Sequence, residues 1–478
     1  MIVALAGAYA LRERGVAGVG VAGGSATVDP FVALVPALVG VAAGIVVVRL
    51  FPFPVRALAR VAAARRGLVP AYALRRLGRE SSSGLILAVL MATATIATFC
   101  SVVLVTLDRA ADATAWHDVG APFRVTALAS GSTGTKAGIP IALPAGFDPA
   151  ALPGATATAE GSTASVPFFP RGAHLDLLAI DTAAYADLAA GTPDEPSFPP
   201  DLLASPDDLV AGAPARPGST AAPIPVIVSA ALAEGVEKLT PGKAFQVIVG
   251  GGPLTLRVVE VRDDVPTMTP GGRFAVVDLA QLRAATSTDA VRSTVAFVRA
   301  PDAAAGAIRA ATAAVSPDLV VASRAEVAAE TRTTPLMEAV VAGLTLAALV
   351  AALYAALAVT CALALSASAR AVEVAHLRTL GLSRRQAAWL IVAEHGPTVV
   401  VAFVVGVVLG VGLFAAVGPA LGTDAIVGSS VAVPLAVEPV HLAGILVAVV
   451  AIVAIGMAVA AAIQRRAVPA LAVRRRMA

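Results

Sequence analysis

The sequence lacks most of the residues from which enzyme and metal sites are built. It holds only two cysteines and five histidines among 478 residues. Both cysteines, Cys100 and Cys361, lie inside apolar runs, which excludes a disulfide-stabilised scaffold. The histidines are scattered and form neither an HExxH nor, with cysteine, a CxxC pattern, so the sequence indicates no metal site.

Motifs for nucleotide chemistry are missing as well. The P-loop pattern GxxxxGK[ST] is absent, so we expect no cofactor and no ATP hydrolysis in this chain itself. A GxGxxG pattern at residues 18–23 follows no predicted strand and precedes no ribose-binding acid, which argues against a dinucleotide site. No GxSxG nucleophile elbow occurs either. No nucleic-acid partner is expected.

Charged residues are scarce and unevenly placed. They make up 14% of the chain against 58% hydrophobic residues, and ordinary soluble domains hold roughly 45–50% apolar residues. A purely soluble protein is therefore excluded. Residues 108–333 hold 24 acidic and 16 basic residues and carry a net charge of −8, while the remainder carries +11. This division indicates one acidic domain and a set of membrane segments with basic flanks.

Apolar runs predict about five transmembrane helices, because a helix needs about 20 apolar residues to cross the hydrocarbon core. The predicted spans are residues 31–51, 84–107, 335–365, 390–417 and 441–463. The third is longer than the bilayer requires, so we expect its surplus to project outward as a stalk. Residues 1–30 are interpreted as a helix remnant followed by an outer linker, as if cut from a longer chain.

Arginine placement orients the predicted spans, since arginine-rich short loops stay in the cytoplasm. The basic segments are 52–83, with an amphipathic stretch, then 366–389, and the tail 464–478. With five crossings, all three fall on the cytoplasmic side. Residues 108–334 then form a large extracytoplasmic domain and residues 418–440 a short outer loop.

The large outer segment predicts an α+β domain of one or two lobes. Short β-like runs, PVIVS, FQVIV, LTLRVVEV and FAVVDL, occur at residues 225–229, 245–249, 254–261 and 274–279. Helical patterns occur at residues 183–190 and 303–315. We interpret the proline-rich stretch 192–223 as a flexible insertion. The predicted fold class is therefore an α-helical membrane protein with one large α+β extracytoplasmic domain.

The basic loop at residues 366–389 is predicted to form a short helical hairpin parallel to the membrane. Apolar residues alternate with Arg370, Glu373 and Arg378 at helical spacing, Gly381 suits a turn, and Ser383 suits the cap of a second helix. The alternative is a basic loop that only touches lipid headgroups.

Two further features lie within predicted spans. Glu394 enters the fourth span, either solvated at the headgroups or paired with an arginine such as Arg378, because intramembrane acids are costly. Small-residue pairs that allow close helix packing or dimer contact are Gly40 with Gly44 and Gly406 with Gly410.

The pattern RxxExxxLRxLGxS, from Arg370 to Ser383, with Glu394 following, resembles the FtsX-like permease family, which includes FtsX and the MacB exporter. The resemblance covers the last four spans, and the extra upstream span is similar to the second half of double-length actinobacterial permeases. It implies an ABC transporter permease in a bacterial plasma (inner) membrane. Its implied partners are membrane lipids, a separate cytoplasmic ATPase that binds ATP and Mg²⁺, and a second permease copy or a missing amino-terminal half.

The resemblance also implies which residues grip the ATPase. These are Arg370, Glu373, Leu377, Arg378, Leu380, Gly381 and Ser383. ATP hydrolysis would move the outer domain to export or extract a hydrophobic substrate. The alternative function is a membrane-anchored scaffold or sensor that regulates an extracytoplasmic enzyme or cell division.

Overall fold

The computed structural model describes residues 81–129, 140–168, 173–192, 198–203, 216–235, 238–286, 291–379, 399–415 and 437–476. The chain divides into two units. The helical unit contains the described chain up to Asp108 and from Pro335 onward, and the sheet unit contains the described residues between Arg109 and Thr334. The predicted span 31–51 and the remnant 1–30 lie outside the described residues.

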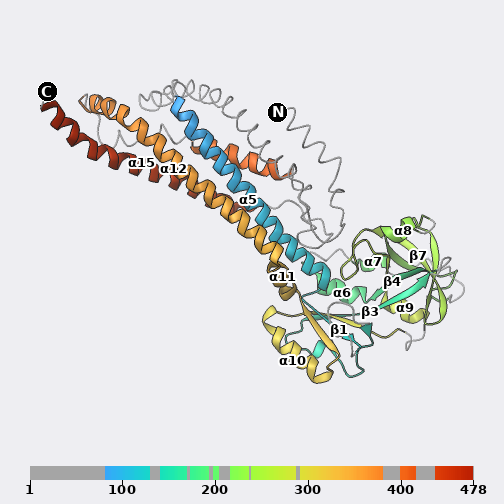
Figure 1. Ribbon diagram of the computed structural model, residues 1–478. Coiled ribbons are helices and arrows are strands. Elements are labelled where there is room, and N and C mark those ends of the chain that lie inside the picture. The colour runs from blue at the N-terminus through green and yellow to red at the C-terminus, as the bar shows by residue number, and fades with distance from the viewer. Residues whose placement is uncertain are drawn as a thin grey trace, which may run out of the picture. The chain divides into compact units, whose positions relative to one another are not determined.

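Among its described residues, the helical unit contains three long apolar helices and one shorter apolar helix (Figure 1). They are α5 (Ser81–Val119), α12 (Pro335–Thr379), the helix Val399–Ala415 and α15 (Pro439–Arg476). In the described chain, α5, α12 and α15 are long and apolar enough to cross a membrane, over Ile86–Val119, Pro335–Leu365 and Pro439–Val459. Three of the five predicted spans therefore correspond to helices of spanning length, and the count of five stays a prediction.

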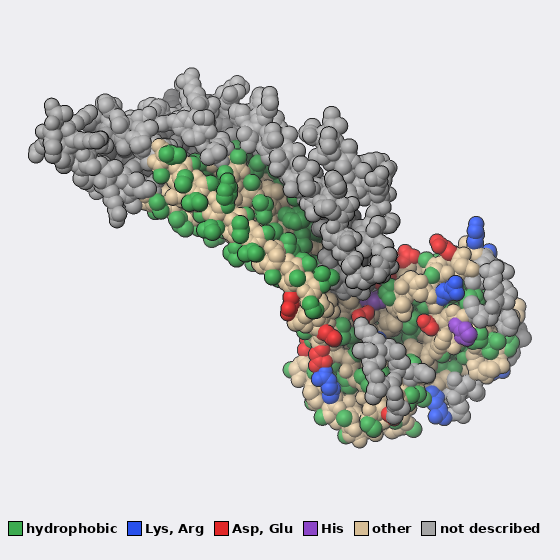
Figure 2. Space-filling model, in the orientation of Figure 1, with side chains coloured by type: hydrophobic (Ala, Val, Ile, Leu, Met, Phe, Trp, Pro, Cys, Tyr) green, Lys and Arg blue, Asp and Glu red, His purple; other side chains and the backbone are tan. Residues whose placement is uncertain are grey.

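Large apolar side chains of α12 and α15 face outward. Leu349 is 68% exposed and Leu353 73% exposed on α12, and Val447 is 67% exposed on α15. On the face shown in Figure 2, hydrophobic side chains cover the described helices, whereas acidic and basic side chains lie mainly on the sheet unit. Exposed apolar surface of this extent is typical of helices whose solvent is lipid.

Two helices extend further than the sequence indicated. α5 was expected to end at residue 107 but continues to Val119, because residues 108–119 contain neither glycine nor proline and Gly120 provides the first break. The first arm of the expected hairpin at residues 366–389 continues α12, and the hairpin itself stays a prediction because its second arm lies outside the described residues. α12 runs unbroken to Thr379 over 45 residues, since no glycine or proline lies between Gly343 and Gly381.

The sheet unit contains a ten-stranded sheet in the order β10-β1-β9-β3-β4-β8-β5-β7-β6, with β2 beside β1. Its elements are β1 (Phe123–Leu128), β2 (Pro140–Ile141), β3 (Ala157–Phe168), β4 (Ala173–Ile180), α6 (Thr182–Ala189), α7 (Pro200–Leu203), β5 (Ile224–Ser229), α8 (Ala230–Gly235), β6 (Ala244–Val249), β7 (Gly252–Arg262), β8 (Phe274–Asp278), α9 (Leu279–Ala285), β9 (Val295–Arg299), α10 (Ala305–Val315), β10 (Leu319–Ser323) and α11 (Arg324–Arg332). The four predicted strands correspond to β5, β6, β7 and β8, and the two helical patterns to α6 and α10.

The sheet has two parts that share β3. The second half of β3 pairs with β4, and the end of β3 pairs with β6 at Phe168 and Val247, which closes β3-β4-β8-β5-β7-β6 into a barrel. The first half of β3 pairs with β9, which continues to β1 and β10. Gly161 lies where β3 changes partner, and a side chain there would meet Val295 at 3.0 Å. A glycine at position 161 therefore lets β3 pair with both β9 and β4 at this point.

Each part has its own core. Inward residues of the barrel strands, among them Phe168, Leu177 and Val247, form one buried cluster. A second cluster packs Phe123, Val125 and Val298 of the other part with Ile308 of α10, which lies beside this part in Figure 1.

The proline-rich stretch is partly ordered, contrary to the expected flexible insertion. Phe198 is 1% exposed and meets Tyr185 edge to face at 4.8 Å between ring centroids, and Leu203 is fully buried. Burial of these apolar side chains offsets part of the entropy that is lost when residues 198–203 take one conformation.

Candidate functional site

The expected ATPase-gripping residues fall at the end of α12. Arg370, Glu373, Leu377 and Arg378 belong to its last turns. Leu380, Gly381, Ser383 and Glu394 lie outside the described residues. The structure therefore makes the first four part of one helix that begins at Pro335.

The glycines of the fourth predicted span lie at a close helix contact. A side chain at Gly406 would meet the Ala94 Cβ at 2.5 Å, and one at Gly410 would meet the Thr98 Cβ at 2.7 Å. The helix Val399–Ala415 and α5 thus approach through backbone, as small-residue pairs allow in membranes. Gly40 and Gly44 lie outside the described residues.

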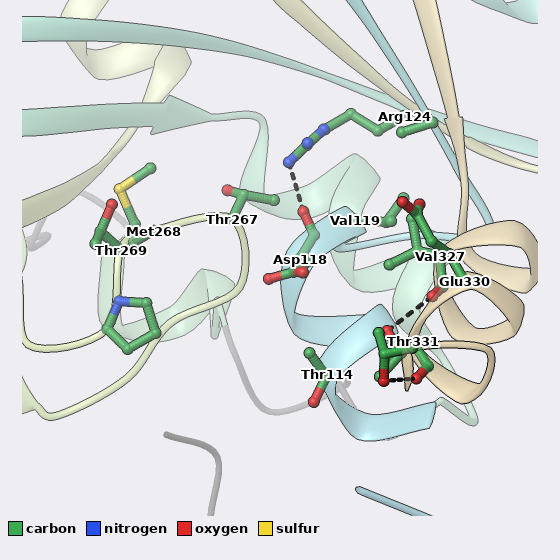
Figure 3. A pocket seen from close by; sticks show the side chains of 13 residues that line it. Thr114, Asp118, Val119, Arg124, Thr267, Met268, Thr269, Val327, Glu330 and Thr331 are labelled. Atoms are coloured by element: carbon green, nitrogen blue, oxygen red, sulfur yellow. Dashed lines mark hydrogen bonds between the residues drawn. The ribbon is translucent and has the colours of Figure 1, made fainter. Parts of the chain in front are cut away.

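A polar cleft of about 570 Å³ in the sheet unit is a second candidate site. Its walls are the end of α5, the start of β1, the loop 263–272, β10 and α11 (Figure 3). The polar side chains that line it are Thr114, Asp118, Arg124, Thr267, Thr269, Glu330, Thr331 and Thr334. No motif in the sequence indicates this cleft.

Arg124 is the main cation of the cleft. Its side chain points toward Asp118 in Figure 3, and Nη1 donates to the Asp118 carbonyl oxygen at 2.6 Å. Nε is buried without an acceptor among the described residues. Burial lowers the pKa of the Arg124 guanidinium, while the nearby Asp118 charge opposes this shift. The guanidinium stays charged at physiological pH, because its ordinary pKa is far above neutrality.

His117 ties the end of α5 to the loop that forms one wall of the cleft. The buried ring has Nε2 3.1 Å from the Met268 carbonyl oxygen and Nδ1 3.3 Å from Oδ1 of Asp264. The His117 carbonyl accepts the Thr267 amide at 2.7 Å. Burial raises the pKa of Asp264, against the attraction of His117 and a backbone hydrogen bond from Val265.

The end of α5 is shaped by Gly120. Its φ of +73° suits glycine, and its amide donates to the Trp116 carbonyl at 2.7 Å, which closes the helix. The Tyr185 hydroxyl then donates to the Gly120 carbonyl. A side chain at Gly120 would meet Thr267 at 2.8 Å, so the glycine also lets the cleft loop approach.

Asp112 of α5 forms ion pairs with two arginines of α11. Oδ1 of Asp112 is 3.6 Å from Nη1 of Arg324 and 3.2 Å from Nη2 of Arg332. The Arg324 guanidinium also lies 5.0 Å from the Trp116 ring centre. These contacts hold the last turns of α5 against the start and end of α11. In the described part of the chain, no group of three or more histidine, cysteine or acidic side chains is placed to hold a metal ion.

The carboxyl-terminal helices match a known family model. Residues 345–469 match the model described as FtsX-like permease C-terminal. Over these residues the chain is similar to the FtsX-like permeases. The match includes most of α12, the helix Val399–Ala415 and most of α15.

Two solved structures are similar to parts of the chain. The extracellular domain of the ABC-type transporter YknZ from Gram-positive bacteria is 17% identical, with 36% of this chain and 84% of that chain covered at a TM-score of 0.22. The periplasmic region of MacB from Actinobacillus actinomycetemcomitans is 12% identical, with 46% and 96% covered at a TM-score of 0.29. At such TM-scores neither likeness bears on the function of this chain. No curated protein matches the chain.

The residues that build the cleft carry little signal in the sequence. In the sequence His117 is one of five scattered histidines, and no motif includes Arg124 or Asp264. One local signal exists, because His117 precedes Gly120 by three residues and a cation is favoured in the last turn of a helix. Asp264 lies 147 residues from His117 in the sequence, so no local sequence pattern indicates their contact.

Proposed function

We propose that the chain is the transmembrane permease subunit of an ABC transporter of the FtsX/MacB type. It couples ATP hydrolysis by a separate cytoplasmic ATPase, which binds ATP and Mg²⁺, to motion of the sheet unit. The cargo is a hydrophobic substrate that is exported or extracted from a bacterial plasma membrane. The observation that carries this proposal is the family match over residues 345–469.

The continuity of α12 supports the coupling step. At 45 residues and about 1.5 Å per residue, α12 is about 68 Å long, against a hydrocarbon core of about 30 Å. One unbroken helix therefore connects Pro335, next to the sheet unit in the chain, with Arg370 and Arg378 near the other end. Because α12 is continuous and has no hinge, a displacement of one end of the helix also moves the other end.

The helical unit also supports a hydrophobic cargo. An apolar hollow of about 620 Å³ lies between α5, α12 and α15, with Cys100, Leu104, Leu349 and Val449 in its lining. It is bordered by Thr93, Ser101 and Thr345, and none of its lining residues is acidic or basic apart from His441. Such a lining suits an acyl chain or an apolar side chain better than an ion or a sugar.

Arginine chemistry offers a test of the coupling site. A bidentate contact from Arg378 to an ATPase carboxylate cannot be replaced fully by lysine, which lacks the planar guanidinium. A contact with lipid headgroups alone can. The tagged chain is purified from native membranes, its P-loop ATPase is identified by mass spectrometry, and cargo-coupled ATPase activity is measured after reconstitution.

The expected result is that Leu377→Asp loses the ATPase and that Arg378→Lys loses coupling by about tenfold, the loss of one charge-assisted hydrogen bond. Arg474→Lys in the basic tail is the matched control and should behave as wild type. Copurification without any ATPase would favour the scaffold or sensor. Equal coupling in wild type and both loop variants would remove the proposed role of this segment.

A further inference from the structure

His117 makes three contacts with one loop. From the last turn of α5 its ring reaches Asp264 and the Met268 carbonyl, and its own carbonyl accepts the Thr267 amide. The same loop forms one wall of the cleft, and its residues Thr267, Met268 and Thr269 line that wall. Thr267 has a φ of +68°, a conformation that a non-glycine residue keeps only when its surroundings hold it.

The contacts fix where the protons of the pair are. A carbonyl oxygen only accepts, so Nε2 of His117 carries hydrogen and donates to Met268. Nδ1 faces Oδ1 of Asp264 at 3.3 Å as an ion-pair contact, and that oxygen is buried without a hydrogen-bond partner among the described residues. This contact attracts only if one proton lies between the two atoms, as imidazolium with carboxylate or as imidazole with carboxylic acid.

The charges around the pair are mostly negative. Asp118 on α5 and Asp263 on the loop both act on Asp264. Glu330 of α11 and Arg124 of β1 line the same cleft, and the Arg124 guanidinium bonds the Asp118 carbonyl. The negative end of the α5 macrodipole also lies here. This surplus of negative potential favours keeping the shared proton and disfavours the fully deprotonated pair.

We propose that His117 and Asp264 share one proton that latches the loop 263–272 to the end of α5, and that loss of this proton frees the loop and with it one wall of the cleft. The device is independent of the proposed ATPase coupling, because every residue in it belongs to the sheet unit.

The pH direction follows from the Asp264 carboxyl. Burial raises its pKa, and Asp118 and Asp263 add to the shift, so the latched state holds a proton at pH values where an unfolded aspartate has lost it. The latched state therefore loses stability as the pH rises from the ordinary aspartate range through the raised pKa. The latch is tightest in acid and is released toward alkaline pH.

Hydrogen exchange of the full-length protein in detergent micelles tests the latch. Mass spectrometry follows the amides of residues 263–272 from about pH 5 to about pH 9, corrected for intrinsic exchange, a range that lies above the ordinary aspartate pKa of about 3.9. We expect protection in wild type to fall about tenfold or more with rising pH, because the buried ion-pair contact between His117 and Asp264 is lost. His117→Gln keeps a donor but cannot titrate, and Asp264→Asn cannot ionise, so both profiles should be flat.

Two controls make the result specific. His174→Gln changes an exposed histidine on β4 and should leave the wild-type profile intact. Asp263→Asn removes a charge that raises the pKa of Asp264 and should move the midpoint to lower pH. A pH-independent wild type, or a wild-type profile in His117→Gln and Asp264→Asn, overturns the proposal. Loss of protection in β8 as well would mean that His117→Gln and Asp264→Asn have unfolded. In that case the pH midpoint of exchange in Asp263→Asn is the deciding measurement, and a midpoint equal to that of wild type overturns the proposal.

Discussion

The contact between α5 and the helix Val399–Ala415 makes a quantitative prediction for alanine substitutions. The new methyl group of Gly406→Ala would lie 2.5 Å from the Ala94 Cβ, and that of Gly410→Ala 2.7 Å from the Thr98 Cβ and 2.8 Å from the Thr95 carbonyl oxygen. Non-bonded carbons are attracted best at about 3.5–4.0 Å, so each substitution has to separate the backbones by about 1 Å.

The destabilisation from the steric clash is partly offset by the higher helix propensity of alanine. Overpacking of this kind costs about 1–3 kcal/mol, while glycine to alanine in a helix returns about 1 kcal/mol. Gly412 of the same helix meets no atom within 4 Å, so Gly412→Ala takes the gain without the clash. We expect each contact variant to unfold about 1–3 kcal/mol more easily than the Gly412→Ala control.

Thermal or SDS unfolding in micelles, followed by circular dichroism, measures these differences. One displacement of the helix relieves both clashes, so the double variant Gly406→Ala/Gly410→Ala should cost less than the sum of its singles. Equal stability of Gly406→Ala, Gly410→Ala and Gly412→Ala would refute the close approach of these helices. Strict additivity would refute the shared displacement.

Three further predictions concern the sheet unit and the topology. Tyr185→Phe leaves the buried Gly120 carbonyl without its hydroxyl donor and should lower the free energy of unfolding by about 1–3 kcal/mol in a urea titration. Asp278→Ala removes the acceptor for the Gln281 amide and the Thr182 hydroxyl, so it should cost about 1–2 kcal/mol in the same titration, whereas Asp278→Asn should cost less. A cysteine at Ser219 should react with an impermeant thiol reagent added outside and one at Ser82 should not, and labelling of Ser82 alone would reverse the topology.

The strands that could be predicted are those with a continuous apolar run. β5 and β8 bury nearly all of their residues and contain continuous runs of apolar side chains. β6 and β7 bury fewer residues, but their valine, isoleucine, leucine and phenylalanine side chains contribute to the same core. β3 reads ATAEGSTASVPF and carries no such run. Its place in the fold depends on three partners that pair with different parts of it, and that information is not local.

The candidate sites differ in the same way. The segment from Arg370 to Ser383 is one contiguous pattern, so it could be singled out without any structure. The cleft is assembled from residues near 114–124, 267–270 and 322–334, which are brought together by the antiparallel pairing of β1 with β10. Neither the register nor the loop conformation at Thr267 has a signature in the sequence.

The energetics of the α5–α11 contact indicate which interactions make it rigid. The side chains of Asp112, Arg324 and Arg332 are partly exposed, so their ion pairs contribute about 0–1 kcal/mol each and are screened by salt. The Arg324 guanidinium over Trp116 adds about 0.5–1 kcal/mol. Backbone contacts are less easily lost, because the Arg324 amide donates to the Pro122 carbonyl at 3.0 Å. This backbone hydrogen bond therefore holds the start of α11 beside the residues that follow α5, independently of the salt-sensitive ion pairs.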